Sequence, residues 1–226
     1  MISIIVPTLN ESENIPKFLK NLIKIRFKYE LIFVDDNSWD NTQNIIKKIK
    51  NKRIKFILRK DKIRDLSKSV MLGIENSKYN YVLVLDCDLQ HDIKNANKMV
   101  NTLLKKNLDL VIGSRFLKTK YSGNLGFFRS LFSVFFIILI NFLFKKKTSD
   151  PLSGFFLCKK SLILKNKKNY FLQGYKILFD ILYNSDQKLN LSDINIIFQK
   201  RILGASKLNK RIVGIFIKQL IYTISR

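Results

Sequence analysis

Short apolar runs alternate with longer amphipathic stretches through the first half of the chain, and this alternation constrains the fold most. Residues 2–6, 31–34, 54–58, 81–85 and 109–113 predict buried strands, and residues 15–25, 42–50, 66–76 and 95–105 predict helices between them. Strands that alternate with helices form parallel pairs through right-handed crossovers. We therefore expect an α/β fold, in which a doubly wound, mostly parallel sheet carries helices on both faces. No linker or repeat divides the 226 residues, which favours a single domain over residues 1–226.

Polar side chains follow four of these predicted strands at the point where each strand ends. They are Asn10 and Glu11, Asp35 and Asp36, Asp86 and Asp88, and Ser114 and Arg115. The carboxyl ends of parallel strands share one edge of an open sheet, where such folds bind their ligands. We expect the four groups to converge on one crevice.

The segment Asp86-Cys87-Asp88 carries two carboxylates one residue apart at the end of a strand. Taken alone, such a pair is more often a turn or a helix cap than a metal site. Carboxylate oxygens are also the ligands that Mg²⁺ and Mn²⁺ prefer, completed by water and substrate phosphates. The position of the pair at the shared edge favours the second interpretation.

The glycine-rich loops that usually hold nucleotides are absent from this sequence. Neither G-x-G-x-x-G after the first strand nor G-x-x-x-x-G-K-[ST] occurs, and residues 7–11 read Pro-Thr-Leu-Asn-Glu instead. A nucleotide would therefore be held by acidic groups and a metal rather than by a glycine cradle.

Composition excludes some classes of site and leaves one alternative open. The two cysteines, Cys87 and Cys158, match neither a disulfide framework nor a zinc spacing, and His91 is the only histidine. The formal net charge of +25 could attract nucleic acid or an anionic membrane. Lysine is abundant everywhere, however, and no nucleic-acid-binding motif stands out. A basic nucleic-acid-binding protein is thus an alternative that rests on charge alone.

The second half of the chain contains two apolar stretches that predict helices, residues 126–144 and 208–226. The first has a strongly apolar run of fourteen residues, 131–144, interrupted by Ser133 and Asn141. A spanning helix needs about 20 apolar residues, so we expect no spanning helix in this chain. A buried core helix and a helix lying in the membrane interface remain equally open, and Lys145 to Lys147 could meet anionic headgroups.

The polar motifs occur in an order that resembles glycosyltransferase family 2 with the GT-A fold. The broad resemblance rests on residues 6–11, 34–42 and 85–92. A narrower resemblance, to dolichyl-phosphate mannosyltransferases and related polyprenyl-phosphate glycosyltransferases, rests on residues 113–116, Arg129 with Ser133, and residues 150–156, 174–178 and 201–208. Together these motifs cover nearly the whole chain. The resemblance implies a nucleotide-sugar-binding half, residues 1–116, and an acceptor half, residues 117–226.

The same resemblance assigns roles to individual residues. The residues expected to bind the nucleotide sugar are Pro7, Leu9, Glu11, Val34, Asp36, Asp86, Cys87, Lys176 and Arg201. The metal, Mg²⁺ or Mn²⁺, would be held by Asp88 and Gln90, and the acceptor phosphate by Arg115, Arg129 and Ser133. Asp86, Asp88, Arg115 and Arg129 are the expected catalytic residues.

The activity that the resemblance implies is inverting transfer of a hexose from a nucleotide sugar to a polyprenyl or dolichyl phosphate. Mannose from GDP-mannose is the leading donor, and UDP-glucose or another UDP-sugar is an alternative. A saccharide hydroxyl is an alternative acceptor, but it would need a carboxylate base, whereas a lipid monophosphate with a second pKa of about 6 is already largely a dianion at neutral pH. The chain departs from the family at several positions: Leu9 replaces an aromatic residue, Cys87 a small one, and Asp65-Leu66-Ser67 a Gly-Leu pair.

The expected location is the cytoplasmic side of a membrane, as a peripheral protein. Many relatives carry transmembrane helices after the catalytic domain, whereas residues 208–226 are the last apolar stretch here. Either the two apolar helices dock the protein directly, or a separate membrane-anchoring subunit does so.

Overall fold

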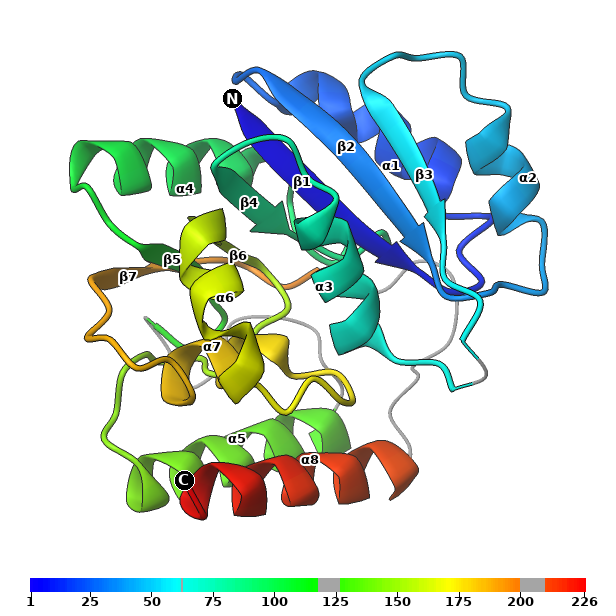
Figure 1. The fold of residues 1–226 in the computed structure, drawn as a ribbon. Helices are drawn as coiled ribbons and strands as arrows, with labels where there is room; N and C mark the ends of the chain where they lie inside the picture. Colours follow the sequence, from blue (N-terminus) through cyan, green and yellow to red (C-terminus); the bar gives the residue numbers. More distant parts are fainter. Residues whose placement is uncertain (62, 118–126, 200–209) are drawn as a thin grey trace.

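The computed structural model describes residues 1–61, 63–117, 127–199 and 210–226, and the side chains of residues 127–129 are not among those described. A seven-stranded sheet with the order β3-β2-β1-β4-β6-β5-β7 runs through the molecule (Figure 1). The strands are β1 (Ile2–Thr8), β2 (Tyr29–Asp35), β3 (Ile54–Leu58), β4 (Tyr81–Val84), β5 (Leu110–Ser114), β6 (Phe156–Lys159) and β7 (Leu191–Asn195).

All the strands except β6 run in the same direction. β1 pairs in parallel with β2 and β4, β2 with β3, and β5 with β7. β6 lies antiparallel between β4 and β5, so these two strands point the same way. The expected mostly parallel sheet and the expected helices on both faces are confirmed. The antiparallel strand was not predicted. Because β6 and β7 come from the second half of the chain, both halves build one sheet.

The helices pack around this sheet and follow the predicted positions in the first half. They are α1 (Ile15–Asn21), α2 (Thr42–Lys47), α3 (Leu66–Glu75), α4 (Lys94–Lys105), α5 (Phe127–Leu143), α6 (Lys160–Asn166), α7 (Ile177–Tyr183) and α8 (Lys210–Ile224). The first helix is shorter than the predicted stretch, because the chain turns into a 3₁₀ helix at Leu22–Lys24. Asp65 caps α3 by accepting a hydrogen bond from the Lys68 backbone N–H.

The core lies on both faces of the sheet, which explains why the central strands β1, β4 and β5 are mostly apolar rather than alternating. Every residue of β1 is buried. Ile4 and Val6 pack into the cluster that includes Phe18 of α1, while Ile5 packs on the other face with Val70 of α3. A central parallel strand of this kind leaves room for polar groups only at its ends.

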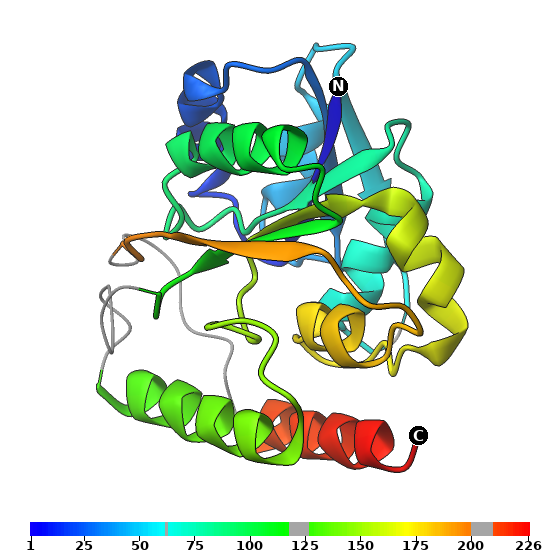
Figure 2. The same cartoon turned by 90° about the vertical axis from the view of Figure 1, so that its left-hand side faces the viewer.

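Helices α5 and α8 lie side by side below the sheet in two perpendicular views (Figures 1 and 2). Their facing sides form a third apolar cluster that includes Phe136 and Ile140 of α5 and Phe216 and Leu220 of α8. Within the described parts of the chain, neither these nor any other helix combines the length and the apolar character needed to cross a membrane.

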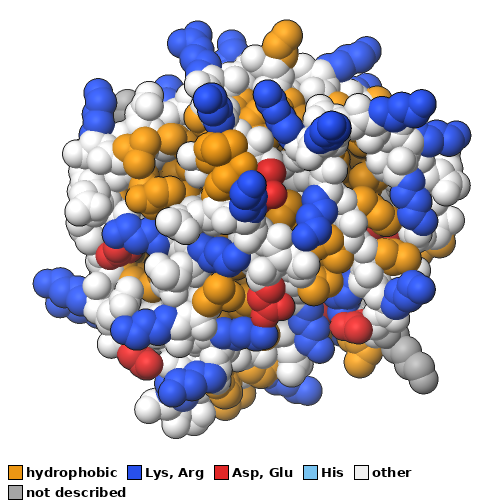
Figure 3. Space-filling model, turned by 45° about the horizontal axis from the view of Figure 1, so that its top comes forward, with side chains coloured by type: hydrophobic (Ala, Val, Ile, Leu, Met, Phe, Trp, Pro, Cys, Tyr) orange, Lys and Arg blue, Asp and Glu red, His pale blue; other side chains and the backbone are white. Residues whose placement is uncertain are grey.

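The basic side chains are dispersed over the face seen in Figure 3. Lys and Arg side chains alternate there with apolar and uncharged ones, and a few acidic side chains lie among them. The high net charge is therefore not gathered into a single basic patch on this face.

Candidate active site

The carboxyl edge of the sheet is hollowed into a cleft of about 190 Å³ that draws on both halves of the chain. It contains many of the residues predicted from the sequence: Pro7, Leu9, Glu11, Asp36, Asp86, Cys87, Asp88, Gln90, Arg115 and Lys176. The cleft is also lined by residues that were not predicted as site residues: Thr8, Leu66, Ser69, His91, Leu152, Gly154, Tyr175, Phe198 and Ile212. The strand ends thus converge as the parallel topology predicted.

The backbone turns sharply where three strands enter the cleft. Asn10, Asn37 and Leu89 have φ values of 54°, 59° and 61°, in the left-handed region. Asparagine tolerates this region because its short polar side chain bonds locally, whereas leucine does not. Strain at Leu89, which costs on the order of 1 kcal/mol, therefore accompanies the turn that joins Asp88 to Gln90.

Asp35 and Asp36 are adjacent in the sequence but have different environments. Asp35 is fully buried and accepts hydrogen bonds from Ser38 through both its carboxylate oxygens, so it holds a turn. Asp36 lines the cleft, forms an ion pair with the buried Arg59, and accepts a hydrogen bond of 2.6 Å from the Asp65 backbone N–H. Burial raises the pKa of Asp36, and the Asp65 hydrogen bond and Arg59 partly oppose that rise.

The two expected metal ligands, Asp88 and Gln90, lie in the same cleft as Asp86, which was expected to face the nucleotide sugar. Asp86 is half-buried, and Asp88 is buried and accepts a hydrogen bond of 3.1 Å from the Gln90 backbone N–H. The Gln90 side-chain amide nitrogen donates to the Gln199 carbonyl, 3.1 Å away, so the amide orientation is set by the backbone near β7. A Cβ on Gly154 would lie 3.3 Å from the Asp86 carboxylate, so glycine lets the chain pass close to it.

This donor set fits a hard divalent cation. The described residues contain no cluster of three or more His, Cys, Asp or Glu side chains that could enclose a metal. The Asp88 carboxylate and the Gln90 amide oxygen match instead the manner in which Mg²⁺ and Mn²⁺ bind at nucleotide sites, where one or two carboxylates share the ion with substrate phosphates and water.

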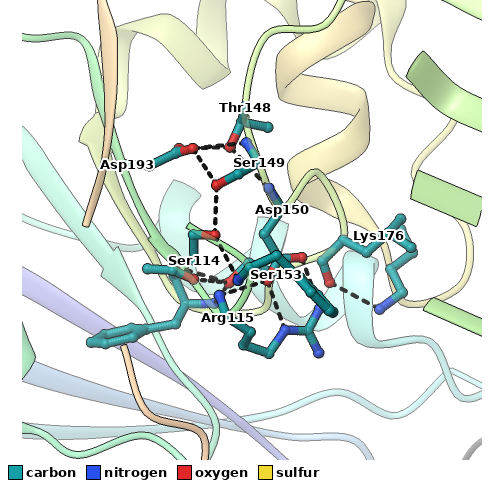
Figure 4. Close-up of polar contacts among 12 residues, drawn as sticks. Ser114, Arg115, Thr148, Ser149, Asp150, Ser153, Lys176 and Asp193 are labelled. Atoms are coloured by element: carbon teal, nitrogen blue, oxygen red, sulfur yellow. Dashed lines mark hydrogen bonds and ion pairs between the residues drawn. The ribbon is translucent and has the colours of Figure 1, made fainter. Parts of the chain in front are cut away.

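Arg115 is held in place by a buried carboxylate (Figure 4). Its Nε and one terminal nitrogen donate to the two oxygens of Asp150 at 2.7 and 2.8 Å, and Asp150 is fully buried. A two-point pair of this kind fixes the plane of the guanidinium as well as its position. The segment that carries Asp150 is also bonded to two strands of the sheet. The Ser149 hydroxyl is hydrogen-bonded to the Ser114 hydroxyl of β5 and donates to the Asp193 carboxylate of β7.

His91 lies in the wall of the cleft as a neutral side chain. It is buried between the rings of Phe155 and Phe198, and its Nδ1 has no hydrogen-bond partner among the described residues. Burial, reinforced by the positive charge of Arg115 and opposed by Asp150, lowers its pKa to about 3. His91 is therefore not charged at neutral pH and shapes the site rather than adding charge to it.

The cleft continues into a second, smaller pocket towards α5 and α8. Arg115, Leu152, Tyr175, Lys176 and Ile212 line both pockets. The second pocket adds Ser133 and side chains that are mostly apolar: Phe132, Gln173, Val213, Ile215, Phe216 and Gln219. Ser133 therefore shares a pocket with Arg115, as the acceptor-phosphate assignment required, although it does not line the main cleft.

Three predicted residues line neither pocket in the described structure. Val34 is fully buried in β2, where it packs in the core with Ile5. Arg201 lies outside the described residues. Arg129 belongs to the first turn of α5, but its side chain is not among those described.

Arg59 and Tyr175 were not among the predicted site residues. Arg59 directly follows β3, and a cation at the end of a fifth strand on the same edge was a signal that could have been used. Tyr175 sits in the segment 174–178 that was quoted as a motif, but its contacts depend on tertiary structure.

Comparisons with known proteins agree with this geometry. Residues 3–166 match the model of the family described as "Glycosyl transferase family 2". A curated dolichol-phosphate mannosyltransferase of Pyrococcus furiosus is 29% identical over 97% of this chain, and the chain spans 62% of the length of that relative. A dolichol-phosphate mannosyltransferase of Saccharomyces cerevisiae is also 29% identical, over 96% of this chain and 85% of the relative.

Solved structures share the fold at lower sequence identity. Glucosyl-3-phosphoglycerate synthase from Mycobacterium tuberculosis, in a complex with Mn²⁺, UDP and glucosyl-3-phosphoglycerate, superimposes with a TM-score of 0.73 at 18% identity, over 99% of this chain and 78% of that one. Staphylococcus aureus TarS residues 1–349 with UDP-GlcNAc gives 0.64 at 16% identity, over 98% of this chain and 66% of that one. With the motifs in order, the strand ends meeting in one cleft and the family model matching most of its length, this chain belongs to glycosyl transferase family 2.

Proposed function

We propose that this protein transfers a hexose, with inversion at the anomeric carbon, from a nucleotide sugar to a polyprenyl or dolichyl phosphate at the cytoplasmic face of a membrane. The observation that carries the proposal is the continuity of the two pockets. The acidic cleft at the sheet edge, suited to a metal-bound nucleotide sugar, opens through Arg115 and Lys176 into an apolar pocket beside α5 and α8. Donor and acceptor would meet at that junction.

In this proposal each side of the junction has its own residues. Pro7, Leu9, Glu11 and Asp36 would contact the base and ribose, Asp86 and Cys87 the sugar, and Lys176 and Arg201 the diphosphate or sugar. Asp88 and Gln90 would hold Mn²⁺ or Mg²⁺, which supplies positive charge against the charge that develops on the departing nucleoside diphosphate. Arg115, Arg129 and Ser133 would orient the acceptor phosphate.

The chemistry needs orientation more than proton transfer. A lipid monophosphate with a second pKa of about 6 attacks as a dianion and requires no strong general base. The described cleft agrees with this, because burial lowers the pKa of its histidine to about 3, which makes that imidazole a weak base. Arg115, fixed by Asp150, would hold the attacking oxygen in line with the anomeric carbon.

GDP-mannose is the donor that we put first, because two curated relatives are dolichol-phosphate mannosyltransferases. A UDP-sugar is the second candidate, because structural neighbours contain UDP or UDP-GlcNAc. Purified protein with Mn²⁺ or Mg²⁺ should transfer labelled sugar from one of these donors to polyprenyl phosphate. Transfer from none of the common nucleotide sugars would overturn the proposal, and preferred transfer to a saccharide hydroxyl would favour the alternative acceptor.

We also propose that α5 and α8 dock the protein on the membrane surface. Their outward sides expose large apolar side chains: Leu131, Phe135, Ile138, Phe142, Ile217, Ile221 and Ile224. Phe142 is 85% exposed. Lysines at 145–147 and Lys210, Arg211 and Lys218 lie next to this apolar surface and are exposed. Apolar residues flanked by cations are typical of helices that lie in an anionic interface.

A vesicle-binding assay tests the docking surface without depending on catalysis. The protein should sediment with vesicles that contain anionic lipid, and Phe142→Asp should weaken that binding at least several-fold. Ile23→Asp is a matched control, because Ile23 is 88% exposed but follows α1, at the other end of the molecule (Figure 1). Equal binding by Phe142→Asp and the native protein would contradict direct docking and favour a separate membrane-anchoring subunit.

A further inference from the structure

Gly174 is bonded at two points to the start of helix α3, although the two segments are far apart in the sequence. The Gly174 backbone N–H donates to the Asp65 carboxylate at 2.6 Å across 109 positions. The Gly174 carbonyl accepts from the Ser67 backbone N–H at 2.9 Å. Two hydrogen bonds therefore join the first half of the chain to the second half directly beside the cleft.

Asp65 makes three different contacts at this position, and it is 4% exposed. One carboxylate oxygen caps α3 through the Lys68 N–H, and the other accepts from Gly174. Its own backbone N–H donates to Asp36, the carboxylate in the cleft. A continuous path of hydrogen bonds thus runs from Asp36 through Asp65 to Gly174.

The conformation of Gly174 determines where the next two side chains go. Its φ is +84°, and a Cβ there would lie 2.8 Å from the Ile215 side chain of α8. Tyr175 and Lys176 follow immediately, and both line the cleft and the second pocket. Lys176 Nζ donates to the Leu152 carbonyl at 3.1 Å, and the Lys176 carbonyl accepts from Gln219 of α8 at 3.2 Å.

The charge environment of Tyr175 agrees with this arrangement. Burial raises the pKa of Tyr175, and the carboxylates of Asp36 and Asp65 raise it further. The negative charges of Asp36 and Asp65, in the first half of the chain, therefore act on the Tyr175 hydroxyl in the second half. Asp65 is also one of the positions at which this chain departs from its family, where a Gly-Leu pair is common.

We propose that Asp65 is a positioning residue for the donor site: by bonding Gly174, its carboxylate sets Lys176 at the place where the diphosphate of the nucleotide sugar binds. The inference rests on the proposed function, because it assumes that a nucleoside diphosphate occupies the cleft. Asp65 itself touches neither substrate, and it acts through the segment 174–176.

Calorimetric titration with GDP and with UDP, in the presence of Mn²⁺, tests the inference. Asp65→Ser retains an oxygen that can cap α3, but its side chain is too short to reach Gly174. We expect this variant to bind the preferred nucleotide about ten-fold more weakly, equivalent to about 1.4 kcal/mol. Ser67→Ala is the matched control, because it changes the same segment but leaves both backbone bonds of Gly174 in place, and its affinity should match that of the native protein.

A double-mutant cycle separates positioning from a general loss of structure. If Asp65 acts through Lys176, then Asp65→Ser should have little further effect on nucleotide affinity in a Lys176→Ala background. In steady-state transfer, Asp65→Ser should raise the donor KM and leave the KM for polyprenyl phosphate unchanged. Should Asp65→Ser fail to fold, Asp65→Asn keeps the size and the capping oxygen and places an amide against Gly174.

The outcomes are distinguishable. Native affinity in both Asp65 variants, or fully additive effects of Asp65→Ser and Lys176→Ala, would overturn the inference while leaving the proposed function intact. Absence of GDP and UDP binding by the native protein would overturn both together.

Discussion

Replacement of Asp150 by alanine should destabilise the protein strongly, because it removes the carboxylate that holds the buried Arg115 at two points. The pair is bidentate, at 2.7 and 2.8 Å, and the side chains are 0% and 9% exposed. Removing one partner of a buried ion pair costs about 3–5 kcal/mol. For a domain of this size, about 2–4 °C of Tm is lost per kcal/mol, so the Tm should fall by about 6–20 °C.

Urea unfolding followed by circular dichroism measures the effect, provided that the slope of the free energy against urea stays constant. Glu75→Ala is the control, because Glu75 pairs with Lys167 on the surface, where the side chains are 33% and 48% exposed. Such exposed pairs contribute about 1 kcal/mol or less. The double variant Arg115→Met with Asp150→Ala should be more stable than Asp150→Ala, because it removes a buried charge that has lost the Asp150 carboxylate.

Two results would refute this reasoning. A loss for Asp150→Ala no larger than that for Glu75→Ala would mean that the pair does not hold Arg115. If the free energy of unfolding lost in the double variant equalled the sum of the losses in the two single variants, the two side chains would contribute independently.

Two further predictions concern His91 in the wall of the cleft and Gly174 beside it. The pKa of His91 is about 3 in the folded protein against an ordinary 6.5, so between these values the unfolded chain binds a proton that the folded chain does not. Stability of the metal-free protein should therefore fall as the pH is lowered from 6.5, with His91 contributing about 1.4 kcal/mol per pH unit below its ordinary pKa. The free energy of unfolding, measured with urea at several pH values between 7 and 5, should depend less steeply on pH in His91→Gln than in the native protein. An equally steep dependence on pH in both proteins would contradict the burial of His91. Gly174→Ala should destabilise by about 1–3 kcal/mol because of its positive φ, and Ile215→Ala should restore only the part due to the close contact with Ile215. Full restoration in the same unfolding assay would show that the backbone conformation is not strained.

The part of the fold that could be predicted is the part built from regular alternation. The central strands β1, β4 and β5 are mostly apolar because both of their faces are covered, and this pattern is visible in the sequence. Asp86 and Asp88 could be assigned to the cleft because parallel strands end at one edge. The antiparallel β6 was missed because its four residues follow a polar turn and carry no periodicity of their own.

The part of the site that could not be predicted depends on contacts between distant segments. Asp35 and Asp36 look equivalent in the sequence, and only the turn at Ser38 shows that the first holds the backbone. The bond between Asp65 and Gly174 joins residues in different halves of the chain. No local pattern specifies it, because Asp65 also reads as an ordinary helix cap.

The central claim is that the cleft at the carboxyl edge binds a nucleotide sugar through a divalent cation at Asp88. Titration of the native protein and of Asp88→Ala with GDP-mannose and UDP-glucose, each with and without Mn²⁺, tests it most directly. The native protein should bind one donor markedly more tightly with Mn²⁺, and Asp88→Ala should lose that metal-dependent gain. A gain of the same size in Asp88→Ala, or binding by the native protein that is indifferent to Mn²⁺, would contradict the account.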